Sequence, residues 1–266
     1  RVRGVGRDWD RITKMTTLKL TIKDFNDLGY YDGPVDVANF DGNIEIDAGT
    51  GWCRFKSSLK ASGDINSVGS VHSAGDIHSG VHIISGGDID SDGYIKSHGY
   101  IKSGGYIASG GYIVSGEGIY SHGYIKSGDY IKSGGYIDSG GYIVSHDFID
   151  SVGYIKSGGY IASGGYIVSG RGIYSIGDIF SGGYIQSGGD INSDGYIKSL
   201  GFIKSVGSLQ SGGYIHSGDF INSGDYIKSG GDIVSGGCIE SVGLVTCKKL
   251  RSGKVASGEL VETGIG

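Results

Sequence analysis

Seven histidines are the side chains of this sequence best suited to general-base catalysis or metal binding. His98, His122 and His146 recur at equal intervals, and His72, His78 and His82 lie close together in the chain. Either group could act together only if the backbone brought its members to one place. Their role therefore depends on the fold that the remaining residues predict.

Acidic residues form a second group that could bind a metal ion. They are Asp24, Asp27, Asp32, Asp36, Asp41, Glu45 and Asp47, with only Lys19 and Lys23 among them. Calcium prefers several oxygen ligands, but this spacing fits no calcium-loop motif. Turn formation and solubility are the favoured explanation, and we expect neither a metal ion nor a cofactor.

A strict six-residue repeat dominates the chain. From Leu59 to Val245 an aliphatic residue occupies every sixth position, 32 times without an insertion, and 28 of these residues are Ile. The unit is Gly-Tyr-Ile-x-Ser-Gly, and the serine two positions after the aliphatic residue is present in all 30 units from Ser67 to Ser241. A short period over most of a chain predicts a solenoid.

Each repeat predicts one short strand and one bend. Because side chains alternate along a strand, the isoleucine and the serine should face inward and their neighbours outward. The serine hydroxyl suits a corner, where it can bond the bending backbone. The flanking glycines should allow positive φ angles and close approach of neighbouring coils.

An internal duplication predicts three repeats per coil. Residues Tyr100 to Ser121 recur as Tyr154 to Ser175, and only Glu117 and Arg171 differ. The two copies are nine repeats apart, which equals three coils of three repeats and keeps every side chain on its own face. The repeats then form roughly ten coils, and adjacent strands about 4.8 Å apart make a rod about 50 Å long.

The segments outside the repeats suggest a domain division. Residues 1–14 are basic and are interpreted as a leader or an added segment; residues 15–58 predict a small β-rich cap, with alternation at Leu18/Leu20/Ile22, Val35/Val37 and Ile44/Ile46. Residues 59–247 form the predicted hexapeptide-repeat solenoid, and residues 248–266 a C-terminal cap or tail. Caps protect the terminal rungs of solenoids from end-to-end pairing.

The repeats, such as Ile95-x-Ser97-x-Gly99, resemble two groups of three-sided β-solenoids. One is the hexapeptide-repeat left-handed β-helix family, best known for acyltransferases, and this resemblance favours a left-handed coil. The other is the bactofilin group of polymer-forming cytoskeletal proteins, whose turns are similar to Gly75-Asp76-Ile77. The resemblance is one of architecture.

The pattern favours a protein that is not an enzyme. Hexapeptide acyltransferases use a catalytic histidine and loops that protrude from the coil, but no insertion interrupts residues 59–245. On 18-residue coils His98, His122 and His146 occupy three different corners, and His72, His78 and His82 lie on different faces. We therefore expect solvated surface histidines.

Aromatic residues predict the candidate binding surface. On one face an uninterrupted ladder precedes the isoleucines and consists of Tyr94, Tyr112, Tyr130, Phe148, Tyr166, Tyr184, Phe202 and Phe220. A second face carries Tyr106, Tyr124, Tyr142 and Tyr160 until Asp178 interrupts, and the third is broken by Gly118 and Gly172. Such a ladder either stabilises adjacent strands only or forms a contact surface.

Several functions remain open. The first is a rigid scaffold that self-associates or binds another protein; the second is a surface that binds a polysaccharide or ice; the third is an acyltransferase. The net charge of −5, with both signs interspersed, argues against nucleic-acid binding. The sequence contains no run of about 18 apolar residues that would predict membrane insertion. The three cysteines form no CxxC pair. A cytoplasmic location is the default expectation.

Overall fold

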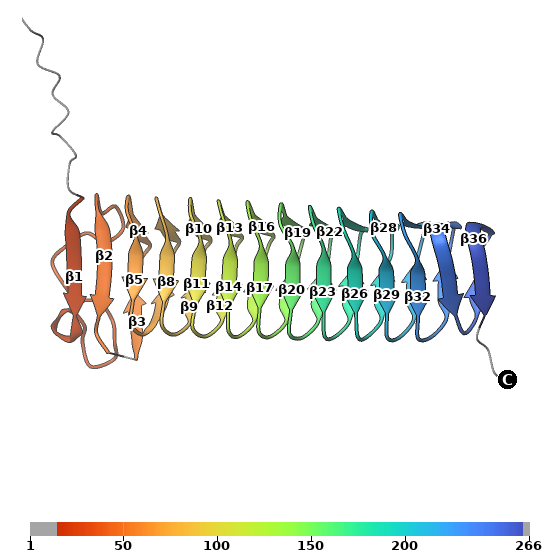
Figure 1. Cartoon of the computed structure of the whole chain (residues 1–266). Coiled ribbons are helices and arrows are strands. Elements are labelled where there is room, and N and C mark those ends of the chain that lie inside the picture. Colours follow the sequence, from red (N-terminus) through yellow and green to blue (C-terminus); the bar gives the residue numbers. More distant parts are fainter. Residues whose placement is uncertain (1–14, 50, 263–266) are drawn as a thin grey trace, which may run out of the picture.

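The chain forms a straight rod of stacked coils (Figure 1). The computed structural model describes residues 15–49 and 51–262, with the backbone alone at residues 256–260. Ile95 pairs in parallel with Ile77 on one side and Ile113 on the other, each three repeats away along the chain. The predicted parallel β-solenoid with three strands per turn is therefore confirmed, while its left-handedness stays a prediction.

The strands lie on three faces, which we name A, B and C. Face A contains β4 (Leu59–Ala61), β7 (Ile77–Ser79), β10 (Ile95–Ser97), β13 (Ile113–Ser115), β16 (Ile131–Ser133), β19 (Ile149–Ser151), β22 (Ile167–Ser169), β25 (Ile185–Ser187), β28 (Ile203–Ser205), β31 (Ile221–Ser223) and the start of β34 (Cys238–Cys247). Face B contains β1 (Thr17–Thr21), β2 (Asn43–Asp47), β5 (Ile65–Ser67), β8 (Ile83–Ser85), β11 (Ile101–Ser103), β14 (Ile119–Ser121), β17 (Ile137–Ser139), β20 (Ile155–Ser157), β23 (Ile173–Ser175), β26 (Ile191–Ser193), β29 (Leu209–Ser211), β32 (Ile227–Ser229) and the end of β34. Face C contains β3 (Trp52–Phe55), β6 (Ser70–Ser73), β9 (Ile89–Ser91), β12 (Ile107–Ser109), β15 (Ile125–Ser127), β18 (Ile143–Ser145), β21 (Ile161–Ser163), β24 (Ile179–Ser181), β27 (Ile197–Ser199), β30 (Ile215–Ser217), β33 (Ile233–Ser235) and β35 (Leu250–Arg251). The twelve strands of face C correspond to about twelve turns, more than the ten predicted for the repeats, because the flanking segments coil as well.

The core is a set of isoleucine columns. Ile131 and Ser133 of β16 are buried, whereas Lys132 between them is exposed, and the same inward and outward alternation holds in the other three-residue strands. Each isoleucine stacks on the isoleucine of the next turn, so the buried residues form one continuous cluster along the rod. The predicted alternation of side chains is confirmed.

Buried serines tie each corner to the preceding turn. The Ser103 hydroxyl donates to the carbonyl oxygen of Gly87, 2.7 Å away and 16 residues earlier, and its oxygen accepts from the backbone N–H of Gly105 at 3.1 Å. The same bond to the preceding turn recurs along the repeats, for example from Ser127 to Gly111. These hydroxyls satisfy backbone groups that the bends leave outside the strand ladders.

The repeat glycines are explained by close approach and not by positive φ. Among the described glycines, only Gly29, Gly42 and Gly49, all before the repeats, have positive φ, so the prediction of positive φ at the repeat corners was wrong. A Cβ atom built on Gly104 would collide with the carbonyl oxygen of Gly86 one turn below. The corners therefore favour glycine because neighbouring turns leave no space there.

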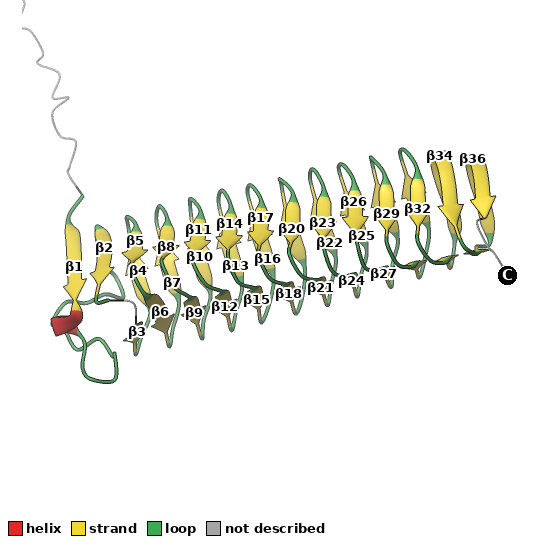
Figure 2. Ribbon diagram, turned by 60° about the horizontal axis from the view of Figure 1, so that its bottom comes forward, coloured by secondary structure: helices red, strands yellow, loops and turns green. Residues whose placement is uncertain are grey.

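The N-terminal segment joins the same parallel stack through longer turns. β1 pairs with β2, Thr17 with Asn43, and β2 pairs with β5, Ile44 with Ile65, so both steps are longer than the three repeats of a regular turn. The extra residues form the 3-10 turn η1 (Ile22–Asp24) and the loop beyond it (Figure 2). The predicted strand at Val35/Val37 was wrong: this part of the loop is not a strand, although Val37 is buried.

The C-terminal turns become shorter. Ile233 pairs with Leu250, a step one residue shorter than three repeats. β36 (Lys254–Glu262) pairs with β34, and here the step is two and then three residues shorter, from Cys238 to Lys254 and from Leu244 to Glu259. The predicted loss of the six-residue register after Val245 thus coincides with a contracted final turn. The division at residues 58 and 247 stays a prediction, and residues 1–14 lie outside the described ranges.

A matched pair of leucines should test the core. Leu209 is 0 % exposed in β29, whereas Leu200 is 60 % exposed at a corner. Leu209→Ala should lower the free energy of unfolding by about 2–5 kcal/mol through the cavity it leaves, and Leu200→Ala should change it by no more than about 0.5 kcal/mol. Urea denaturation measures both, and equal effects would contradict a buried column at residue 209.

A corner serine should contribute through its hydroxyl. Ser127→Ala leaves the Gly111 carbonyl without its donor and the Asp129 N–H without its acceptor, so we expect a loss of about 1–3 kcal/mol. The control is Ser62→Ala, whose exposed hydroxyl donates to Asp41 at 2.7 Å and should contribute about 0.5 kcal/mol or less. Urea midpoints that shift equally would show that burial of the bond is irrelevant.

Candidate interaction surface

The eight aromatic residues predicted to form a ladder stack continuously along face A. Adjacent ring centroids from Tyr94 to Phe220 lie 4.6–5.1 Å apart, with interplanar angles of 3–12°. Each ring belongs to the residue before a buried isoleucine, so its position is set by the strand register. All eight are half-buried. The faces of the rings cover one another, and their edges and tips form the exposed strip.

Charged residues lie at the start of this ladder. One turn before Tyr94, the equivalent position holds Asp76, whose carboxylate is 2.9 Å from the Lys60 ammonium group. The same ammonium lies 5.6 Å from the centroid of the Tyr94 ring, within the range of a cation–π contact. The aromatic strip therefore ends against an ion pair on its N-terminal side.

Burial changes the acidity of the stacked phenols. Burial raises the pKa of Tyr112 and Tyr166, and nearby ionisable groups add to this effect; for Tyr112 these are Tyr94, Tyr130 and Asp76. On face C burial, with smaller contributions from Asp90 and Tyr124, raises the pKa of Tyr106 to about 12. These hydroxyls thus stay protonated further into the alkaline range than an ordinary phenol does.

Face C carries a shorter ladder. Tyr106, Tyr124, Tyr142 and Tyr160 stack at 4.6–5.1 Å, Asp178 interrupts the row as predicted, and Tyr196 and Tyr214 form a further pair at 4.8 Å. Between these rings the outward column of face C includes the small residues Ala108, Val144 and Ala162. The continuous aromatic row of face C is therefore shorter than that of face A.

Face B differs because two of its tyrosines change position within the repeat. Gly118 and Gly172 replace the expected aromatic residues, and Tyr120 and Tyr174 appear two positions later, on the outward side of the strand. The Tyr174 ring folds back over Gly172, where a Cβ atom would collide with it. The exchange of Gly and Tyr in these two repeats was the sequence signal for this arrangement, and sequence analysis missed it.

The histidines do not converge on one site. His98, His122 and His146 lie at three different corners, after β10, β14 and β18. His72 is 3.2 Å from Asp90 on face C. The rings of His78 and His98, which belong to different groups of histidines, lie 5.9 Å apart on successive turns. This contact was not predicted. Burial, together with Lys96 and His98, lowers the pKa of His78.

The acidic residues near the N-terminus bond to the chain around them. Asp24 accepts from the backbone N–H of Thr21 at 2.7 Å, and Asp36 accepts from that of Ala38 at 2.9 Å. These bonds agree with the turn-forming role favoured above. In the described ranges no cluster of three or more His, Cys, Asp or Glu residues could hold a metal ion.

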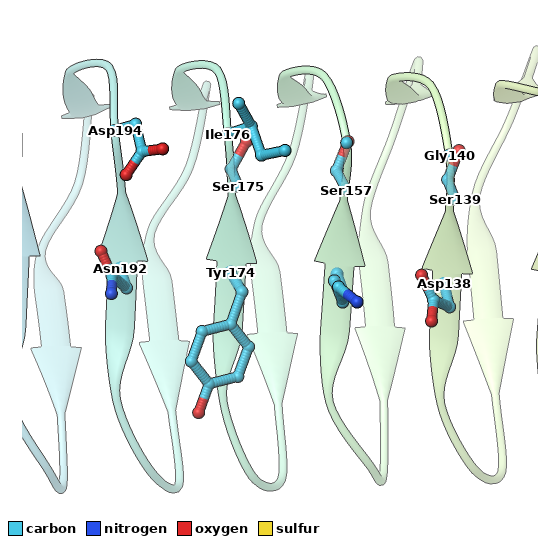
Figure 3. Close-up of a pocket in the computed structure, with 11 residues that line it drawn as sticks. Asp138, Ser139, Gly140, Ser157, Tyr174, Ser175, Ile176, Asn192 and Asp194 are labelled. Atoms are coloured by element: carbon cyan, nitrogen blue, oxygen red, sulfur yellow. The ribbon is translucent and has the colours of Figure 1, made fainter.

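The hollows on the rod are shallow grooves between side chains. One lies on face B beside Tyr174, and Figure 3 shows this ring projecting from β23, with Asn192 on the next strand and Asp138 two strands away on the other side. A second groove on the same face is lined by Tyr100, Lys102, Tyr120, His122 and Tyr136. Face B thus has two projecting tyrosines, Tyr120 and Tyr174, with a shallow region of shorter side chains between them.

Comparisons with protein-family models, curated proteins and solved structures found no match. Among the described residues no helix has the length and apolar character needed to cross a membrane. The function of the chain must therefore be inferred from its own surface, whose most regular feature is the aromatic ladder of face A.

Alkaline pH should destabilise the rod through its tyrosines. Folding raises the pKa of these phenols, so their contribution to the free energy of unfolding is fully present below pH about 10, the usual pKa of the phenol. This contribution is lost as the pH rises toward about 12, the pKa of Tyr106. Urea denaturation across this range should show the decrease, and Tyr106→Phe should lose less. Ultraviolet titration of the folded protein with all phenols ionising near pH 10 would contradict this prediction.

Proposed function

We propose that this protein is a non-enzymatic rigid rod that acts as a scaffold or self-association module, with the face A ladder as its contact surface. The observation that supports this proposal is the uninterrupted stack of eight half-buried rings on a straight solenoid. The resemblance to hexapeptide-repeat solenoids and to the polymer-forming bactofilin group agrees with it.

Preorganisation is the physical basis of the proposal. Each ring is held by the strand register and by its stacked neighbours, so binding orders few additional side chains and loses little conformational entropy. Tyrosine and phenylalanine are enriched in protein interfaces. Beside the ladder, the outward residues of face A include charged, polar and apolar types, for example Lys96, Val114 and Gln186, which suits a contact with a mixed protein surface.

A polysaccharide or ice surface is the second candidate, favoured by the regular spacing of the rings. Sugar rings bind aromatic side chains through the ring faces, but here the faces cover one another at 4.6–5.1 Å. Glycan binding would therefore depend on the phenol hydroxyls at the edge of the strip. The same hydroxyls would have to carry any ice contact, since the repeats contain no threonine array.

An acyltransferase is the third candidate and has the least support. The strands of residues 59–245 follow one another without a protruding loop that could hold an acyl donor. Turnover of an acyl-CoA by the purified protein would overturn the non-enzymatic proposal.

Replacing part of the ladder tests its role. Tyr112, Tyr130, Tyr166 and Tyr184 changed together to Ser should reduce the oligomer mass measured by light scattering, because the contact strip loses its aromatic edges. The matched control changes Tyr106, Tyr124, Tyr142 and Tyr160 on face C to Ser. Unchanged assembly with lost glycan or ice binding would favour the second candidate, and no change in either would leave the ladder purely structural.

A further inference from the structure

Face B carries a pattern of side chains with two-fold complementarity. When a second rod runs in the opposite direction, each charged residue of the pattern faces a residue of opposite charge. The pattern covers four successive strands, β14, β17, β20 and β23, which pair in register. Its centre lies midway between β17 and β20. An end-for-end rotation about this centre exchanges β14 with β23 and β17 with β20.

The corner residues that precede the outer two strands have opposite charges. Glu117 and Arg171 are the single difference between the duplicated segments Tyr100 to Ser121 and Tyr154 to Ser175, so they occupy the same place three turns apart, about 14 Å along the rod. Both are exposed. Within the described ranges, neither side chain makes an ion pair.

The inner two strands repeat this opposition. Asp138 of β17 and Lys156 of β20 are the outward residues on either side of the centre, and their backbones are in register. Neither belongs to an ion pair in the part of the chain that the structure describes. The duplication does not explain this pair, because Asp138 lies between the two copies, so it is an independent observation.

The uncharged residues of the pattern match as well. Tyr120 and Tyr174 project from the outer strands, and Tyr136 and Tyr154, stacked at 5.4 Å, precede the inner ones. Tyr136 and Tyr174 are each 39 % exposed. The end-for-end rotation places Tyr120 against Tyr174 of the second copy and Tyr136 against Tyr154 of the second copy.

We propose that face B is the contact surface of an antiparallel homodimer, related by a two-fold axis parallel to the strands and midway between β17 and β20. This inference rests on the proposed self-association and identifies the partner as a second copy of the chain. Glu117 then lies against Arg171 of the second copy and Asp138 against Lys156 of the second copy. Because a two-fold contact is isologous, each pair forms twice.

A parallel arrangement does not use the same complementarity. A parallel copy at the same height places Glu117 at the level of Glu117 of the other rod. A parallel copy shifted by three turns brings Glu117 to the level of Arg171 once and leaves the reverse pair unmade, in an open contact that continues into filaments. Only the antiparallel dimer forms both pairs twice in a closed assembly, and complementary charges of this kind specify partner and register.

Charge reversal tests the proposal. Glu117→Arg and Arg171→Glu should each abolish the dimer measured by sedimentation equilibrium, because like charges then face each other twice. A mixture of the two variants should form a 1:1 heterodimer, since every pair is opposite again, and the double variant should recover the homodimer. Lys126→Glu changes an exposed residue of face C and is the control, which should dimerise as the unaltered chain does.

A cysteine pair tests the orientation. Lys102 of β11 and Asn192 of β26 are equally distant from the centre, so the antiparallel dimer places Lys102 against Asn192 of the second copy. Lys102→Cys mixed with Asn192→Cys should form an intermolecular disulfide, whereas each variant alone should not, because its two copies are five turns apart, about 24 Å.

The outcomes separate this inference from the proposed function. An oligomer mass that neither single charge reversal lowers, or a mixture that does not regain the mass of the unaltered chain, overturns the face B dimer while self-association through face A stands. A monomeric unaltered chain overturns both. Dimers that are lost on charge reversal but persist in the ladder variant support the face B dimer and remove the role given to face A.

Discussion

The hydrogen bond that the corner serines from Ser73 to Ser241 make to the turn before them is the interaction on which the rest of this structure depends. The serine hydroxyl reaches back 16 residues to a carbonyl oxygen, as from Ser103 to Gly87 at 2.7 Å, and so requires the preceding turn to pass at a fixed place. Together with the backbone ladders, in which the Ile95 N–H donates to the Tyr112 carbonyl at 2.9 Å, it holds the turns of the regular region at three repeats.

Constant turn length has a direct effect on the surface. When every turn contains three repeats, a side chain type that recurs at that interval forms a column, so Tyr94, Tyr112 and Tyr130 stack although each belongs to a separate turn. Columns of constant spacing occur between the longer steps near the N-terminus and the shorter steps near the C-terminus, and the aromatic ladder of face A ends within this region, at Asp76. The regular surface is therefore limited to the region of regular hydrogen bonding.

The three faces share a core but differ in what they present outward. Face A offers ring edges with mixed charges, face C a shorter aromatic row, and face B two projecting tyrosines around opposite charges. Because stability in such a rod is close to a sum of contacts between neighbouring turns, outward residues can change without affecting the isoleucine columns. A scaffold with several distinct contact surfaces is a natural use of this independence.

The sequence by itself determined the fold class, because a six-residue period with Ile and Ser at two-residue spacing allows one inward pattern, and its nine-repeat duplication indicated three repeats per turn and so the membership of each face. Only the tertiary structure decided the rest. The glycines at the corners were expected to need positive φ. They are required instead because Gly86 and its equivalents lie one turn below, a contact that the local sequence pattern does not reveal. The path of residues 22–42, without the strand expected at Val35/Val37, depends on packing of Val37 and Phe25 over the first turns. The structure likewise showed that Glu117 and Arg171 are both exposed at one corner of the rod, since exposure depends on how the turns around a side chain pack.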